Sequence, residues 1–362
     1  MSSAVSAPKA SAPRRPSLWS RLPVVRQLRQ SVGLQRGMLV AGLVVTAAFV
    51  LTAVFAPLLA PYGYSQLRDL DGAFGAQQSP SADHLLGTTV GGYDVLSRVI
   101  WGSQTAALVI VVAIVASIFL GILIGLVSGY FGGWIDRVLV VVCDAIYSFP
   151  SLLLAILAAI VISGGQSDLW GGILAAALSI TVVFIPQYFR VVRSEVVRIK
   201  GEAFIDSARV IGTPHLRIMV RHVLRNSTRT LPLIVTLNAS EAVLTLAGLG
   251  FLGFGIEPTA AAEWGYDLNK AIADVSSGIW WTALFPGLAI VLSVLGITLV
   301  GESLNDLADP RLRSRRLSKQ VAGRVEQTSV AAPTVPGGVV TDELTLPGEA
   351  SQLDTLEGED RS

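Results

Sequence analysis

Six long apolar runs constrain the fold more than any other feature of this sequence. Each has about the 20 apolar residues that a helix needs to cross the hydrocarbon core of a bilayer. Lipid offers no hydrogen bonds to an open backbone, so we predict an all-α membrane protein with six transmembrane helices. The runs are approximately Met38–Leu59, Trp101–Ser128, Val138–Ile162, Leu169–Phe189, Thr230–Phe254 and Trp280–Val300. Only 15% of the residues are charged, whereas soluble domains have about 25%.

The charges between the runs predict an orientation. Pro61–Ser97 and Gly255–Ile279 each contain four acidic residues and one basic residue. Residues 1–36 contain seven basic residues and no acidic one, and Arg311–Arg324 is also basic. Short basic segments are retained in the cytoplasm, so we expect both termini there and the two acidic segments on the other side.

We expect three parts along the chain. Residues 1–36 form a basic, partly disordered N-terminal cytoplasmic segment, and residues 37–310 form the six-span transmembrane domain. Residues 311–362 are rich in Pro, Gly, Thr and acidic residues after Arg324. Such a composition cannot bury enough apolar surface to fold, so we expect a disordered cytoplasmic tail.

One polar segment, residues 190–229, separates two of the predicted spans and contains nine basic residues against three acidic ones. We expect a first helix that ends near Ile211, with Gly212 as the left-handed residue that closes it. Thr213 is then a suitable N-cap for a second helix, with Pro214 at its first position. The charges alone are equally compatible with an ordinary cytoplasmic loop.

Two features inside the spans go beyond apolar character. Gly121, Gly125 and Gly129 recur every four residues, which predicts a smooth helix ridge for close packing. Asp144 and Glu241 are ionisable residues within apolar runs. A carboxylate there either faces a water-filled passage or makes a structural hydrogen bond near a membrane boundary, and both interpretations stay open.

The sequence also argues against several kinds of chemistry. No GxxxxGK[ST] motif occurs, so we do not expect this chain to bind a nucleotide by the P-loop route. The single cysteine and three histidines have no metal-ligand spacing, and we expect no metal site. If ATP drives this protein, another polypeptide must hydrolyse it.

The order of residues in the polar segment carries a more specific signal. Asp206-Ser-Ala-Arg-Val-Ile-Gly212 resembles the EAA loop of ABC importer permeases. In that family the loop forms a short coupling helix that docks into a groove on an ATPase subunit. Small residues at 207 and 208 suit a helix that sits deep in a groove, and an acid near the helix start favours the dipole. This sequence departs from the usual pattern at Asp206, where Glu is commoner, and at Arg225, where a proline is frequent.

The resemblance implies two sets of functional residues. The residues implied for ATPase coupling are Glu202, Asp206, Ser207, Ala208, Arg209, Gly212, His215 and Arg217. The residues expected beside the translocation pathway are Asp144, Glu241, Phe251, Gly253 and Gly255.

Further motifs extend the resemblance to approximately Leu22–Arg316. In chain order they are His84–Thr88, Tyr93–Arg98, Ser128–Asp136, Phe251–Gly255, Glu263–Gly265, Trp280–Gly287 and Asp309–Arg313. Together they are similar to the second permease subunit of the dipeptide, oligopeptide and nickel branch. Thr89-Val-Gly-Gly92 differs from the acidic-glycine-arginine run that is usual there.

This resemblance implies a type I ABC importer permease in the bacterial inner membrane, working by alternating access. It would form half of a peptide pathway as a heterodimer with a homologous permease. The other expected partners are two ATPase subunits or one fused ATPase, an extracellular or periplasmic substrate-binding protein and membrane lipid, but no nucleic acid. The chain itself would be no enzyme and hold no cofactor, because ATP and Mg²⁺ would be bound by the ATPase subunits.

Other functions remain compatible with the residues alone. Nickel, haem and other small solutes are carried within the same branch, and peptide is chosen only because it is the most frequent. An ion-driven secondary transporter could also have six spans with acidic residues such as Asp144 and Glu241 inside them. A membrane-embedded enzyme is the weakest alternative, because no nucleophile–base pair stands out.

Overall fold

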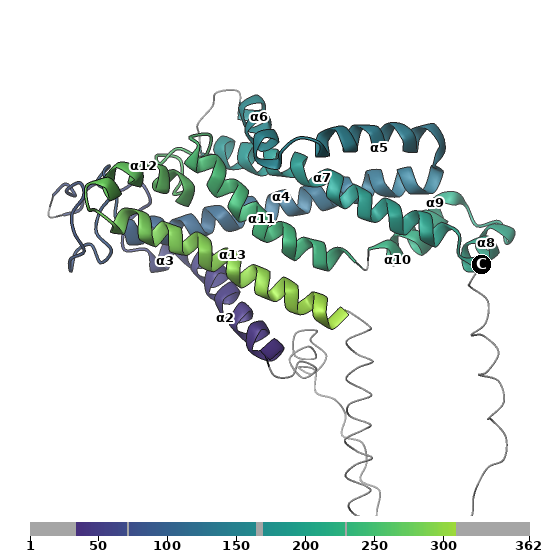
Figure 1. The fold of residues 1–362 in the computed structure, drawn as a ribbon, viewed down its shortest axis with the longest axis horizontal. Coiled ribbons are helices and arrows are strands. Elements are labelled where there is room, and N and C mark those ends of the chain that lie inside the picture. Colours follow the sequence, from purple (N-terminus) through teal and green to yellow (C-terminus); the bar gives the residue numbers. More distant parts are fainter. Residues whose placement is uncertain (1–33, 71, 164–168, 229, 309–362) are drawn as a thin grey trace, which may run out of the picture. The chain divides into compact units, whose positions relative to one another are not determined.

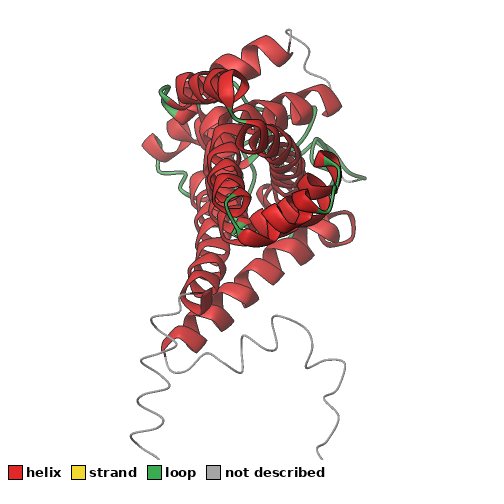
Figure 2. Cartoon of the chain, turned by 90° about the vertical axis from the view of Figure 1, so that its right-hand side faces the viewer, coloured by secondary structure: helices red, strands yellow, loops and turns green. Residues whose placement is uncertain are grey.

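The computed structural model describes residues 34–70, 72–163, 169–228 and 230–308 of the chain, and these are overwhelmingly helical (Figure 1). Of the expected N-terminal segment, only residues 34–36 are described. Residues 1–33 and the expected tail, residues 311–362, lie outside the described ranges. Within the described residues no strand forms, and only two isolated bridges occur, Arg68–Ala73 and Thr88–Asp94 (Figure 2). The expected all-α class is therefore confirmed.

Among the described helices, five are long and apolar enough to cross a membrane. They are α2 (Leu34–Val54), α4 (Val95–Phe131), α7 (Leu169–Lys200), α11 (Leu231–Phe251) and α13 (Trp281–Ala308). A sixth span exists if α5 (Gly133–Tyr147) and α6 (Ser151–Ser163) are taken together.

The third predicted run does not form one continuous helix, so this part of the sequence prediction is wrong. α5 and α6 are bent by 100° relative to each other, and residues 148–150 separate them. Pro150 has no N–H to donate to a preceding turn, and it disfavours a helical conformation at Phe149. The apolar run is long enough to span a bilayer, but its proline divides it.

Shorter helices occupy the connections between the spans. They are α3 (Ala56–Leu59), α8 (Ala203–Val210), α9 (His215–Arg217), the π-helix η2 (Ile218–Leu224), α10 (Arg225–Ser227) and α12 (Trp264–Ser276). α12 lies at one end of the long helices α4 and α7, whereas α8 and α9 lie at the other end (Figure 1).

α4 and α7 pack closely against each other along a row of glycines. A Cβ added at Gly125 would lie 2.9 Å from the carbonyl oxygen of Phe189, and one added at Gly129 would lie 2.8 Å from Cγ1 of Val196. At Gly121 the added atom would clash with the side chain of Tyr188. The predicted glycine ridge is therefore confirmed, because only hydrogen atoms fit between these helices.

Both central helices are longer than the apolar runs that predicted them. α4 begins early because the Asp94 carboxylate caps it and accepts a hydrogen bond from the backbone N–H of Ser97, at 2.7 Å. α7 continues past the apolar run to Lys200. Its extension buries Val192, Val196 and Ile199, whose spacing of four and three residues keeps one face apolar. α7 thereby carries the start of the polar segment as a helix.

Candidate functional site

The polar segment contains α8, which is held by two buried residues. Ile205 and Ala208 lie three residues apart on one face of this eight-residue helix, and they belong to the same core cluster as Ile218 and Val223 of η2. An isolated helix of this length is not stable in water. Packing against η2 therefore decides both the existence and the orientation of α8.

A tight turn follows α8. Gly212 has a φ of +74°, a value that costs other residues about 1–2 kcal/mol. The backbone N–H groups of Gly212 and Thr213 donate to the carbonyls of Arg209 and Ala208, at 2.9 and 3.1 Å. The prediction for Gly212 is confirmed. The start of the second helix was predicted one residue too early, because Pro214 has an extended ψ of 145° and acts as the N-cap while α9 begins at His215.

Most of the predicted coupling residues lie at the surface of this chain. Those exposed are Glu202, Asp206, Ser207, Arg209, Gly212, His215 and Arg217. Ala208 differs, because it is buried in the core of the chain and its small size serves internal packing. Asp206 forms an ion pair with Arg209 on its own helix, at 2.9 Å.

His215 ties the segment to the end of α4. Its Nδ1 lies 2.9 Å from the hydroxyl oxygen of Tyr130, and the Lys200 ammonium donates a 2.5 Å hydrogen bond to the Tyr130 carbonyl. The ends of α4 and α7 and the start of α9 are thereby joined through one tyrosine. A displacement of α9 would act directly on the two longest helices.

Sequence reasoning missed a set of exposed apolar side chains here. The coupling surface, as we call it, consists of Phe204, Val210, Ile211, Leu216 and Val220. Val210 and Ile211 are 88% and 80% exposed, which costs free energy in water unless a partner covers them. The polar segment contains more apolar residues than the buried face of α8 needs. This excess is the sequence signal that could have predicted an exposed apolar surface.

The predicted pathway residues do not gather at one point. Asp144, at the end of α5, forms an exposed ion pair with Arg190 of α7, at 2.8 Å. Glu241, in the middle of α11, is half-buried and lines a pocket of 220 Å³ beside the break between α5 and α6. Phe251 lies exposed at the end of α11.

Gly253 and Gly255 line a second pocket of 210 Å³, which is bounded by α6 and α7. Gly253 has a φ of +83°, a conformation that glycine adopts at little cost. Gly255 approaches Gly250 so closely that an added Cβ would clash with the Gly250 backbone. The glycines therefore allow the chain to fold back sharply after α11.

At the end of the bundle that contains α12, hydrogen bonds attach the two acidic segments, residues 61–97 and 255–279, to the spans and to each other. Arg98 of α4 is buried, and its Nε donates to both carboxylate oxygens of Asp267, at 2.7 and 2.8 Å. The Gln77 side chain donates to Asp274 at 2.6 Å, so the first acidic segment bonds to α12 as well. We call this region the α12 end.

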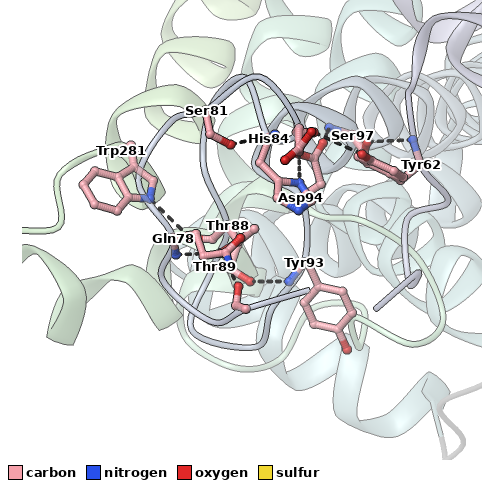
Figure 3. A network of polar contacts seen from close by, with 12 residues as sticks. Tyr62, Gln78, Ser81, His84, Thr88, Thr89, Tyr93, Asp94, Ser97 and Trp281 are labelled. Atoms are coloured by element: carbon pink, nitrogen blue, oxygen red, sulfur yellow. Dashed lines mark hydrogen bonds and ion pairs between the residues drawn. The ribbon is translucent and has the colours of Figure 1, made fainter. Parts of the chain in front are cut away.

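A polar network organises the first acidic segment (Figure 3). The His84 ring nitrogen lies 2.9 Å from the Asp94 carboxylate, and both groups are buried. The Tyr62 backbone N–H donates to the hydroxyl of Ser97, and the Trp281 indole donates to the carbonyl of Thr88. The segment therefore folds back onto the starts of α4 and α13.

Glu263 is a buried carboxyl group that caps α12, outside the candidate spans. It accepts hydrogen bonds from the backbone N–H groups of Gly265 and Tyr266, at 2.8 and 2.7 Å. Burial raises the pKa of Glu263 from 4.5 to about 8, although these two hydrogen bonds act in the opposite direction. Gly250 packs against the carboxyl group and leaves no room for a Cβ. The cap thus joins α11 to α12.

These features define a class of protein: a helical membrane protein with a compact α12 end and an exposed apolar segment at the opposite end. Residues 121–314 match the family described as the binding-protein-dependent transport system inner membrane component. Residues 34–86 match the N-terminal TM domain of oligopeptide transport permease C. The chain belongs to this family of inner membrane transport permeases and is a multi-pass protein of the bacterial inner membrane.

Similar proteins support the assignment along most of the chain. The dipeptide transport system permease protein DppC of Alkalihalophilus pseudofirmus is 36% identical over 275 residues, which cover 76% of this chain and 86% of the relative. The glutathione transport system permease protein GsiD of Escherichia coli O6:K15:H31 is 34% identical over 264 residues, or 73% of this chain and 83% of the relative. The predicted class, an ABC importer permease of the dipeptide and oligopeptide family, is confirmed.

Proposed function

We propose that this chain forms half of a translocation pathway for short peptides and that separate ATPase subunits drive it through the polar segment. The coupling surface is the observation that carries this proposal. Its exposed apolar side chains lie on α8, on the turn that follows it, on α9 and on η2, next to exposed arginines. A surface of this composition suits a protein partner better than water.

The connection from this surface to the spans supports a mechanical role. α8 packs on η2, and α9 is bonded through Tyr130 to the ends of α4 and α7. A partner that shifts α8 and α9 would therefore move the helices that form the centre of the bundle. In the proposed mechanism, closure of the ATPases on ATP displaces the segment and reopens the passage on the other membrane face.

The partners proposed here follow from the family. A homologous permease would complete the passage, two ATPase subunits or one fused ATPase would bind ATP and Mg²⁺, and a binding protein outside the membrane would deliver the solute. The two acidic segments, residues 61–97 and 255–279, are the surfaces proposed to receive the binding protein. The peptide substrate is supported by the relatives, whose names refer to dipeptide and glutathione transport.

A charge reversal tests the coupling assignment. Asp206 is exposed on α8, so Asp206→Arg should leave the chain folded while repelling a partner that accommodates an acid there. We expect weaker ATPase association and slower peptide uptake by the reconstituted complex. Glu302→Arg, at an exposed position near the end of α13, is the control and should keep both. Normal uptake by the Asp206 variant would contradict the assignment.

A steric substitution provides a second test with a matched control. A Cβ added at Gly212 would meet no atom within 4 Å, so a side chain there would project into open space. Gly212→Trp and Gly212→Ala share the backbone strain of a positive φ, but only tryptophan has the bulk to obstruct a docked subunit. Uptake should fall much further with tryptophan, and equal losses would assign the effect to strain.

A further inference from the structure

A pocket beside the break between α5 and α6 has the features of a binding site. The 220 Å³ pocket lies between α7, α11 and the break that separates α5 from α6. Glu241, Gln187 and Ser151 contribute its polar side chains, and Tyr147 and Phe149 contribute aromatic rings. None of the residues that line it is basic.

The Glu241 carboxylate has no partner among the described residues. Glu241 lies ten residues from either end of α11, which places it near the middle of a span. Apart from the backbone hydrogen bonds of the helix, Glu241 is bonded only at its carbonyl, which accepts from the hydroxyl of Thr245 at 2.8 Å. A carboxylate at this depth is costly unless it faces a water-filled cavity or a positive charge.

The nearby arginine does not supply that charge. Arg190 lies over the ring of Tyr147, 4.1 Å from its centroid, and its guanidinium is bonded to Asp144. Asp144 therefore has an internal partner and Glu241 has none. This difference separates the two acids that the sequence left equivalent.

The backbone around the pocket is interrupted on two sides. α5 and α6 are bent by 100°, and Pro186 lies inside α7, next to Gln187. A proline within a helix leaves the carbonyl one turn earlier without its usual hydrogen bond. Interrupted helices at membrane depth occur where they line a cavity, and transporters commonly place their solute sites there.

We propose that this pocket binds the side-chain ammonium group of a lysine residue in a peptide during its passage. Glu241 supplies the opposite charge, the amide oxygen of Gln187 supplies a neutral acceptor, and Phe149 supplies an aromatic ring that can attract a cation, whereas the Tyr147 ring is already in contact with Arg190. This inference rests on the proposed function, since it names the chemical group recognised within the proposed pathway. The predicted pathway role of Glu241 thereby becomes a specific interaction.

The test uses the complete complex with its binding protein in proteoliposomes that contain ATP. Uptake of Ala-Lys-Ala, Ala-Ala-Ala and Ala-Glu-Ala is measured for the wild type and for Glu241→Gln, Glu241→Asp and Glu302→Gln. Each rate is divided by the wild-type rate for the same peptide, which cancels the selectivity of the binding protein. Glu302 is an exposed acid of α13 outside the pocket and serves as the control.

We expect Glu241→Gln to lower the relative uptake of Ala-Lys-Ala about tenfold. The same variant should change the relative uptake of Ala-Glu-Ala less than about twofold, and Glu241→Asp should restore much of the lysine-peptide uptake. Glu302→Gln should change the relative uptake of the three peptides by the same factor.

Equal losses for all three peptides in Glu241→Gln would overturn the site and leave the peptide function intact. Failure of Glu241→Gln to assemble, while Glu302→Gln assembles, would assign the carboxylate to subunit contacts and also overturn it. A wild-type complex that imports none of the three peptides would overturn the proposed function, and the site with it.

Discussion

The two ends of the bundle satisfy their side chains in opposite ways. At the α12 end, charged groups such as Arg98 and Asp267 are buried and bonded within the chain. In the polar segment at the opposite end, the pair Asp206–Arg209 is exposed, and apolar residues such as Ile211 face solvent. The α12 end pairs charged groups within the chain, whereas the other end presents a surface that a partner can cover.

This contrast bears on where motion enters the molecule. Buried ion pairs lose much free energy when they are separated, so the α12 end resists deformation. Exposed pairs contribute little, and α8 is held mainly by two apolar residues. A partner can therefore displace the polar segment at a lower cost in free energy than the α12 end.

The largest effect is expected from breaking the buried ion pair. Arg98→Met leaves the Asp267 carboxylate buried without its partner and should destabilise the protein by about 3–5 kcal/mol. Arg209→Met, in the exposed pair, should cost at most about 1 kcal/mol. Unfolding of the detergent-solubilised chain measures both. Arg98→Met with Asp267→Leu should recover stability, and equal effects of the two single variants would refute the contrast.

The second comparison uses one glycine from each end. A Cβ at Gly265 would clash with the carbonyl of Ala247 on α11, so Gly265→Ala should destabilise the protein by about 3 kcal/mol. Gly212→Ala introduces backbone strain but no clash, and it should destabilise the protein by about 1 kcal/mol. Unfolding midpoints of the two variants give the order. A larger loss with Gly212→Ala would show that the turn, and not the α12 end, is the tightly packed region.

The third prediction concerns pH and the α12 end. The pKa of Glu263 is raised from 4.5 to about 8, so the folded state holds a proton that the unfolded state releases. This contribution is fully present below about pH 4.5 and is lost as the pH rises through about 8, by up to about 1.4 kcal/mol per unit. Protection factors of the α12 amides, in which the intrinsic rise of exchange with pH is divided out, should fall over this range. Glu263→Gln should lose that dependence, and a variant that kept the wild-type profile would exclude Glu263 as its source.

The smallest effect on stability is expected on the coupling surface. Ile211→Ser removes an exposed apolar side chain and should change stability by less than about 0.5 kcal/mol. It should nevertheless weaken ATPase association by more than about 1 kcal/mol, because it truncates the centre of a docking surface. Ile272→Ser, at an exposed position of α12, is the matched control. ATPase binding that is unchanged by Ile211→Ser, or reduced equally by both, would contradict the assignment.

Local signals in the sequence were sufficient for several elements. The glycine ridge of α4 and the turn at Gly212 follow from backbone geometry and side-chain size, and both are confirmed. The break before α6 was not predicted, because the apolar run is long enough for one continuous span. Pro150 is the residue in the sequence that marks the break. The start of α9 was misplaced by one residue, since a proline can precede a helix as well as begin it.

The sequence by itself determined that this is a bundle of membrane spans, since apolar length and loop charge depend only on neighbouring residues. The tertiary structure alone decided which polar groups are partnered. Arg98 meets Asp267 across 169 residues, and Asp144 has a partner while Glu241 has none. The same is true of Ala208, whose burial in the core depends on elements outside its own helix. Such contacts depend on how distant elements pack, and no local pattern specifies that.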